Sequence, residues 1–241
     1  MDRPAIRVEG LTKKFGRRLV VDGLSFSVPA GSVCGLLGRN GAGKSTAIRL
    51  MMNLLDATAG CVTLLGLDHR KDHTALMNRV GYVADAPIPY DWMKVRELVR
   101  FTARFYARWN QSRVDSLLDR FQLDREQKVR HLSRGMQAQV ALILALGGDP
   151  ELLILDEPAT GLDVLVRRDF LESIIQLMQQ EGRTVLYSTH LLHEVERVAD
   201  QAIILDRGRV AQAGSIDDLK ARSGMSLEDT FVEAVGVKER A

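Results

Sequence analysis

The chain has 241 residues, of which 46% are hydrophobic and 27% are charged, a composition typical of a folded globular protein. Its 33 basic and 31 acidic residues leave a formal net charge of +2, which excludes a strong overall field for nucleic acid or anionic membranes. The N-terminus lacks the apolar segment of a secretory signal, and apolar runs such as 140–146 are much shorter than the roughly 20 residues of a spanning helix. We therefore expect a soluble chain.

The first predicted elements are two antiparallel strands at residues 6–11 and 20–28, separated by the basic turn KKFGRR. After them, short β-branched runs alternate with helical patterns, which favours an α/β core with a largely parallel sheet. Its strands are predicted at 32–37, 80–83, 152–155, 184–188 and 202–205. Cys34 and Cys61 both lie in apolar runs and are expected in the core, which fits a reducing cytosol.

Helical signals replace strand signals between residues 84 and 135, which indicates a helical insertion of about fifty residues. Helices are predicted at 95–109 and 114–121, and two more short ones after Gly214. Along the first of them an arginine recurs at every fourth position, which predicts a cationic stripe on one helix face. These residues are Arg96, Arg100, Arg104 and Arg108.

Residues 38–46, GRNGAGKST, follow the strand-like run VCGLL and open the helical pattern AIRLMMNLL. A strand, a glycine-rich loop and a helix in this order form a cradle for phosphate, because the backbone N–H groups and the helix N-terminus face the anion. We expect Lys44 to reach the β and γ phosphates and the Ser45 hydroxyl to bind Mg²⁺. A chance glycine-rich turn is the alternative. The predicted nucleotide site comprises Gly38, Arg39, Asn40, Gly41, Ala42, Gly43, Lys44, Ser45 and Thr46.

A second group of polar residues follows the later predicted strands. Asp156 ends the apolar strand in ELLILDEPATGLD, at the sheet edge where a divalent cation can be held, and Glu157 can polarise a water toward the γ-phosphate. A surface acidic pair is the alternative. His190 follows TVLYST at the same edge and is a candidate donor to the γ-phosphate, although single histidines are more often structural. No such role is expected for His69, His73, His131 or His193.

The phosphate loop, LSRGM, ILDEP, GLD and STH occur in this order, and together they resemble the ATPase subunits of ABC transporters. The resemblance is closest to the exporter type with separate membrane chains. It implies the ABC ATPase fold, an α/β RecA-like P-loop NTPase core with an antiparallel β layer and an inserted helical subdomain. It assigns residues 1–84 and 136–213 to the core, 85–135 to the helical subdomain with the signature motif, and 214–241 to a short helical tail.

The resemblance also implies a head-to-tail dimer, in which each ATP lies between the phosphate loop of one subunit and the signature helix of the other. In LSRGMQAQ, Ser133 is a natural N-cap and Gly135 permits close backbone approach, so this helix offers its positive end to an anion. The resemblance assigns both residues to the γ-phosphate of the partner's ATP. Phe15 matches the aromatic that stacks on adenine, and Asp163 matches the residue that links the two sites.

Two positions depart from the family's usual pattern. Asp85, after GYVA, stands where the family has a glutamine that touches the metal or the attacking water. An aspartate can still bind Mg²⁺ or water, although it is shorter and adds charge. In LSRGM, Arg134 and Met136 replace a glycine and a glutamine of the usual LSGGQ. Because Ser133 and Gly135 remain, we predict ATP hydrolysis with an altered rate or coupling.

The predicted function is therefore to bind ATP and hydrolyse it with Mg²⁺ as a cofactor. As a subunit of a transporter, the chain would thereby energise export by a separate membrane permease. The predicted location is the cytoplasm, at the inner face of the cell membrane through that permease. A soluble ABC-type ATPase acting on ribosomes or nucleic-acid machinery is the alternative, and a non-catalytic ATP-dependent clamp is a third.

The predicted partners are a second ATP-binding subunit, in a homodimer or a heterodimer, and an integral membrane permease docking near Asp85 to Met93. No nucleic acid is expected. The arginine stripe has two interpretations. It is either a solvated face with acidic neighbours, or a contact with an acidic loop of the permease or with anionic lipid headgroups.

Overall fold

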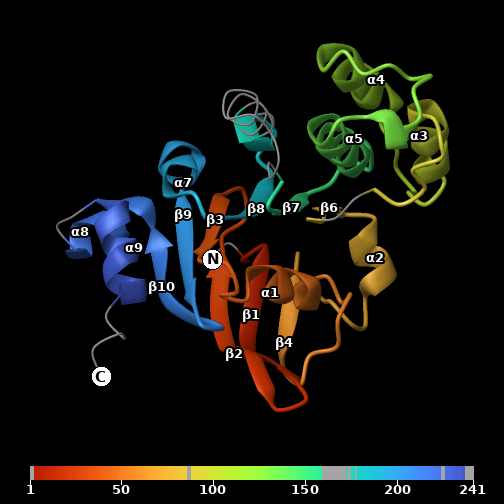
Figure 1. Cartoon of the computed structure of the whole chain (residues 1–241). Helices are drawn as coiled ribbons and strands as arrows, with labels where there is room; N and C mark the ends of the chain where they lie inside the picture. Colours follow the sequence, from red (N-terminus) through yellow and green to blue (C-terminus); the bar gives the residue numbers. More distant parts are fainter. Residues whose placement is uncertain are drawn as a thin grey trace.

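The computed structural model describes residues 3–85, 88–158, 172, 175–176, 178–223 and 226–236. Two sheets organise it (Figure 1). The smaller is antiparallel and has the strand order β2-β1-β4-β5, as expected for an antiparallel layer beside the core. Its strands are β1 (Ile6–Phe15), β2 (Arg18–Val28), β4 (Ala59–Leu64) and β5 (Leu67–Asp68).

The larger sheet has the strand order β10-β9-β3-β8-β7-β6. All of its neighbouring strands pair in parallel except β10, which is antiparallel to β9. This arrangement confirms the predicted α/β core. The strands are β3 (Val33–Gly38), β6 (Val80–Val83), β7 (Leu152–Asp156), β8 (Thr184–Thr189), β9 (Gln201–Asp206) and β10 (Arg209–Ser215).

Both faces of this sheet are covered, which explains why its central strands are continuously apolar. Alternate residues of one strand join different cores. Leu36 packs with helix α1 (Lys44–Met51) and the antiparallel sheet, whereas Leu37 packs on the opposite face, in the core that includes the helical segment. The α1 helix therefore lies between the two sheets, with its first turn directly after β3.

The helices α3, α4 and α5 group together beyond the β6 edge of the sheet, as Figure 1 shows. They span Val95–Ala103, Gln111–Arg120 and Arg134–Gly147, with a 3-10 turn, η1, at Val129–His131. The expected boundary between residues 135 and 136 falls in the first turn of the continuous α5 helix. The remaining helices are α2 (His73–Met77), α7 (Leu192–Val198), α8 (Ile216–Ser223) and α9 (Leu227–Gly236), of which the last two are the expected short helices of the tail.

Two details differ from the sequence-based expectations. The α3 helix ends at Ala103, with Arg104 as its C-cap, so Arg108 is not part of a continuous stripe on this helix. Cys34 is buried as predicted, but the prediction for Cys61 is wrong because its side chain is exposed. It lies opposite Glu9 on a sheet with one face open to solvent, where alternate residues of β4 point outward.

Within the described parts of the chain, every helix is either too short or too polar to cross a membrane.

Candidate functional site

The phosphate loop connects β3 to α1 and lies at the carboxyl end of a buried parallel strand. Gly43 is the N-cap of α1 and has φ 103°, a left-handed conformation that suits glycine. Its carbonyl accepts from Ala47 N at 2.8 Å, and no side chain caps the helix. The first amides of α1 are therefore available to an anion.

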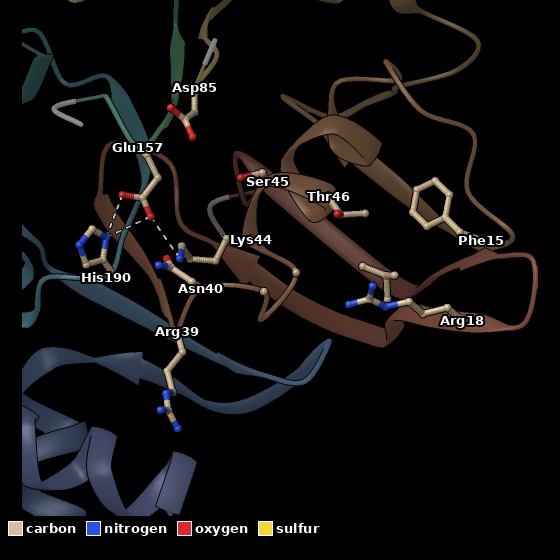
Figure 2. A pocket seen from close by; sticks show the side chains of 13 residues that line it. Phe15, Arg18, Arg39, Asn40, Lys44, Ser45, Thr46, Asp85, Glu157 and His190 are labelled. Carbon is tan, nitrogen blue, oxygen red and sulfur yellow. Dashed lines mark hydrogen bonds and ion pairs between the residues drawn. The ribbon is translucent and has the colours of Figure 1, made fainter. Parts of the chain in front are cut away.

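The loop borders a cavity of about 660 Å³ (Figure 2). Most of the predicted site residues line it, although they come from distant parts of the chain. Gly38 and Ala42 belong to the loop without lining the cavity. The lining residues are Phe15, Arg18, Val20, Arg39, Asn40, Gly41, Gly43, Lys44, Ser45, Thr46, Asp85, Glu157 and His190.

Lys44 lies almost completely buried at the centre of this site. Its Nζ donates to the Gly38 carbonyl at 2.8 Å and lies 3.1 Å from Oε1 of Glu157. The two side chains are only 6% and 10% exposed. A buried ammonium group needs such partners, because desolvation without them is costly.

Glu157 follows β7 and has φ 46°, an unfavourable left-handed conformation for a residue with a side chain. Its backbone N–H donates to Ser188 Oγ at 2.9 Å, which holds it at the end of the neighbouring strand. Its carboxylate lies between Lys44 and His190, with 3.1 Å from Oε2 to Nδ1 of His190 (Figure 2). Backbone strain at a polar site is typical of functional positions.

Asp156, the last residue of β7, is completely buried. Its Oδ1 accepts from Ser45 Oγ at 3.0 Å and from Ser188 Oγ at 2.8 Å, whereas Oδ2 has no hydrogen-bond partner among the described residues. Burial raises the pKa of this carboxyl, and the charge of Asp85 raises it further, against the opposing hydrogen bonds of the two serines.

The oxygen atoms of Ser45 and Asp156 suit a hard divalent cation. The free Oδ2 of Asp156 is a buried oxygen available as a ligand, so these residues fit Mg²⁺. No group of three or more acidic, histidine or cysteine side chains gathers to hold a metal in the described parts of the chain. A cation here would need further ligands, which Mg²⁺ ordinarily takes from water and from substrate phosphates.

Asp85 is exposed after β6 and lines the cavity, so the structure places it at the site, as its sequence position suggested. The positive charge of Arg49 on α1 partly opposes the rise in the pKa of Asp156 that burial causes, and Arg49 also hydrogen-bonds to Tyr82, three residues before Asp85. Sequence reasoning missed Arg49 and Ser188. Ser188 carries a recognisable signal, because it is a polar residue near the end of a fully buried strand, in register with Asp156.

Phe15 lies at the opposite end of the cavity from Glu157, next to the tight turn between β1 and β2 (Figure 2). Its ring is half exposed, and Lys13 Nζ lies 5.0 Å from its centroid. Arg18 of β2 lies toward this end (Figure 2), and Val20 also lines the cavity; neither residue was predicted. An exposed aromatic beside cations can stack on a planar ligand.

Ser133 and Gly135 do not line this cavity. Ser133 is the N-cap of α5, as predicted, and its Oγ accepts from Met136 N at 3.2 Å. Ser133 and Arg134 are exposed, so the positive end of this helix is open to solvent. Asp163 lies outside the described residues.

A family model described as "ABC transporter" matches residues 21–160. The chain is 36% identical over 237 residues to the daunorubicin resistance ATP-binding protein DrrA3 of Streptomyces coeruleorubidus, covering 96% of this chain and 75% of that protein. It is 33% identical over 220 residues to the bacitracin transport ATP-binding protein BcrA of Enterococcus faecalis, covering 90% and 71%. A solved structure described as the ATP binding subunit of an ABC transporter superposes with a TM-score of 0.85 at 28% identity, covering 95% of this chain and 99% of that one.

Proposed function

Because this chain belongs to the ABC transporter family and is an ATP-binding subunit, an ATPase that energises export, we propose that it hydrolyses the β–γ bond of ATP in the cavity described above. One observation carries the proposal. Lys44, Glu157 and His190 line the same cavity as the phosphate loop, and Ser45 of that loop hydrogen-bonds to Asp156. Hydrolysis of this bond depends mainly on positioning and charge neutralisation, which these groups supply.

The loop amides and Lys44 bind the phosphates in this proposal, and Phe15 stacks on the adenine at the other end of the cavity. Ser45 and Asp156 hold Mg²⁺, and Asp85 is a further candidate ligand, directly or through water. When bound, Mg²⁺ would neutralise phosphate charge. Ser188 keeps the Asp156 carboxylate oriented by its hydrogen bond to Oδ1.

Glu157 acts as the base that polarises the attacking water, and His190 is a donor to the γ-phosphate. Nucleotide binding brings phosphate oxygens to Lys44, which then no longer needs the carboxylate of Glu157 as its counter-ion. The freed carboxylate stays anchored through its backbone bond to Ser188, at the edge of the sheet where the γ-phosphate arrives.

The active unit is proposed to be a head-to-tail dimer, a homodimer or a heterodimer. Ser133 and Gly135 are absent from the cavity of their own chain, and the open N-terminus of α5 can bind the γ-phosphate of ATP in a partner subunit. Asp163 would link the two sites. In this arrangement each subunit alone has an incomplete site.

The permease is proposed to dock near Asp85 to Met93, which would hold the chain at the inner face of the cell membrane. Asp85 lines the cavity and Met93 lies two residues before the start of α3, so this loop can report the state of the nucleotide to the permease. We propose the division 1–84 and 136–213 for the core, 85–135 for the helical subdomain and 214–241 for the tail.

Export is the direction that the relatives favour, because their names refer to daunorubicin resistance and bacitracin transport. The soluble alternative, an ATPase acting on ribosomes or nucleic-acid machinery, is not favoured. Affinity purification of Glu157→Gln with ATP, from detergent-solubilised cells of the source organism, tests the assignment. Recovery of a polytopic membrane protein in near-stoichiometric amount is expected, and recovery of ribosomes instead would overturn it.

A further inference from the structure

The His190 side chain is far more exposed than its neighbours in the nucleotide cavity, at 43% against 6% for Lys44 and 10% for Glu157. Among the described residues, the polar contacts of its ring are all with the carboxylate of Glu157, 3.1 Å from Nδ1 at the nearer oxygen (Figure 2). A side chain this exposed gains little orientation from packing. The direction of the ring therefore depends on the backbone that carries it.

The backbone on both sides of His190 is tied together by the side chain of Thr189. The Thr189 hydroxyl accepts from Leu191 N at 3.1 Å and donates to Oε2 of Glu194 at 2.8 Å. Thr189 is only 2% exposed, so water does not compete for these bonds. One hydroxyl thus joins the residue before His190 to the residue after it, and this leaves the bend between them little freedom.

Glu194 is itself held in place, because its helix α7 packs directly on the sheet. The next residue, Val195, is completely buried, and a Cβ added to Gly35 of β3 would lie only 2.8 Å from its γ carbons. Arg197 on the same helix also pairs with Glu172 at 2.8 Å. The carboxylate of Glu194 is therefore an acceptor with a fixed position.

The contacts of Thr189 lie on the side of β8 that faces away from the nucleotide. Successive side chains of a strand point to opposite faces of its sheet. Ser188 bonds to Asp156 and to the backbone of Glu157, whereas Thr189 bonds toward α7. Thr189 and Glu194 do not line the nucleotide cavity. Any effect of these two residues on the reaction must therefore pass through the backbone of His190.

We propose that Thr189 and Glu194 are positioning residues for ATP hydrolysis, because their hydrogen bonds fix the bend at residue 190 and so direct the His190 ring to the γ-phosphate. This assignment rests on the proposed function, in which His190 is a donor to that phosphate. The rigid base is the packing of α7 on β3, and the Thr189 hydroxyl connects this base to the site.

Steady-state ATP turnover by the purified full chain tests the proposal. Thr189→Val keeps the shape of the side chain but removes the hydroxyl. It should lower kcat by about 10- to 100-fold, because a catalytic group about 1 Å out of place costs up to about 10²-fold, and it should leave the KM for ATP nearly unchanged. Thr189→Ser restores the hydroxyl and should recover most of the turnover. Glu194→Ala should behave like Thr189→Val.

The same substitution in a His190→Ala background separates positioning from a general effect. If Thr189 acts by directing the His190 ring, Thr189→Val should lower kcat no further once the ring is gone. A full additional loss of kcat in this background would overturn the proposal, since Thr189 would then act on the reaction by a route other than His190.

Thr184→Val is the matched control. Thr184 lies at the other end of β8, is also 2% exposed, and its Oγ1 accepts from Gly31 N at 2.9 Å. The two valine variants should lose similar stability in thermal unfolding, and Thr184→Val should keep the kcat of the unmodified chain. Equal losses of kcat at the two positions would contradict the proposal, because loosening of the strand would then explain both.

NMR signals of the histidine rings distinguish failure of this proposal from failure of the proposed function. The chain has five histidines, and the His190 signal is identified by its loss in His190→Ala. Without nucleotide, Thr189→Val should shift or broaden this signal, and Thr184→Val should leave it in place. A His190 signal that Thr189→Val does not change would overturn the proposal. Full turnover by His190→Ala would instead contradict the catalytic role of His190, and a changed signal would then leave the positioning by Thr189 standing.

Discussion

Lys44 and Glu157 form a nearly buried ion pair, with 3.1 Å between Nζ and Oε1. The same lysine is proposed to bind the phosphates of ATP and the same glutamate to activate water. Lys44 and Glu157 cannot fill these roles while they are paired with each other. Nucleotide binding must therefore replace the carboxylate of Glu157 with phosphate oxygens as the partner of Lys44. Phosphate therefore competes with the protein's own carboxylate.

Glu157→Gln should bind ATP at least as tightly as the unmodified chain, because the competing carboxylate is removed. Its turnover should fall by about 10²- to 10⁴-fold, the contribution typical of a general base. Titration with a fluorescent ATP analogue and a phosphate-release assay measure the two effects. Light scattering should show an ATP-bound dimer.

The control for this variant is Glu151→Gln, which removes a carboxylate paired with Arg79 away from the nucleotide cavity. It should leave both ATP affinity and turnover unchanged. Clearly weaker ATP binding by Glu157→Gln would mean that the carboxylate supports the nucleotide and does not compete with it.

Ser133→Ala should destabilise the fold by about 1 kcal/mol, the usual cost of losing a serine N-cap, and should also weaken ATP-driven dimerisation. Ser226→Ala is a matched control. Ser226 Oγ accepts from Asp229 N at 3.1 Å near the start of α9, the same type of contact as at Ser133, but in the C-terminal tail.

Thermal unfolding and ATP-dependent light scattering separate the two effects of Ser133. Both variants should lose similar stability, and only Ser133→Ala should lose dimer. If both variants dimerise normally with ATP, Ser133 acts as a helix cap alone.

Asp85→Gln, which restores the family's usual residue, should extend ATP turnover to lower pH. The negative charge of Asp85 raises the pKa of Asp156, so its removal lowers that pKa and keeps the metal-binding carboxylate ionised in more acidic solution. The measurement is the acid limb of the pH–rate profile at saturating ATP and subsaturating Mg²⁺, where protonation of Asp156 competes with metal binding. An acid limb that stays in place or moves to higher pH would exclude electrostatic coupling between the two carboxylates.

Asp156→Asn should raise the stability of the chain at neutral pH in the presence of a chelator, although it abolishes Mg²⁺-dependent turnover. Burial raises the pKa of Asp156 in the folded state above its unfolded value. Between the two pKa values, Asp156 is protonated in the folded chain but ionised in the unfolded chain. Unfolding therefore releases a proton, and the stability of the folded chain falls as pH rises from the unfolded pKa to the folded pKa. The asparagine removes this penalty.

Denaturant unfolding at two pH values tests this prediction. The variant should be more stable than the unmodified chain at neutral pH, and the difference should disappear in acid below both pKa values, where Asp156 is protonated in both states. A constant difference at all pH values would indicate a packing effect.

Arg113→Met should destabilise the chain by about 1 to 3 kcal/mol, because the hydrogen bonds between the Arg113 guanidinium and its acidic partners are lost at a partly buried site. Arg113 on α4 lies 2.5 Å from Glu181 and 3.3 Å from Asp149, and Arg183 pairs with both of these acids at 2.7 Å. This four-residue network joins the helical segment to the segments that lead into β7 and β8.

The control is Arg125→Met, whose exposed ion pairs with Asp119 and Asp115 should together contribute about 1 kcal/mol or less. Urea unfolding compares the two variants. Similar losses at both positions would show that the network around Arg113 is no stronger than an ordinary surface pair.

Several features of the site follow from sequence, because local rules govern them. The glycine loop between strand and helix and the N-cap at Ser133 depend only on neighbouring residues, and both appear as predicted. Asp156 and Glu157 also lie as expected, since the end of a buried parallel strand places such residues at one edge of the sheet.

Helix ends and strand faces were harder to predict. The arginine spacing predicted a helix that continues to residue 109, but the helix ends at Ala103. Periodicity identifies a helix more reliably than it identifies the residue at which the helix ends. Cys61 lies in an apolar run of the sequence, but its side chain is on the solvent-exposed face of β4. Only the pairing of β4 with β1 determines which face is exposed.

The sequence by itself determined the phosphate loop, the acidic pair after a buried strand and the alternation of strands and helices, because each of these features depends on residues that are close together in the chain. The tertiary structure decided which side chains meet: Lys44 with Glu157, Ser188 with Asp156, and Asp85 near enough to shift the pKa of Asp156. These pairs join segments more than thirty residues apart in the chain, one pair by more than a hundred, and only packing of the sheet brings them together.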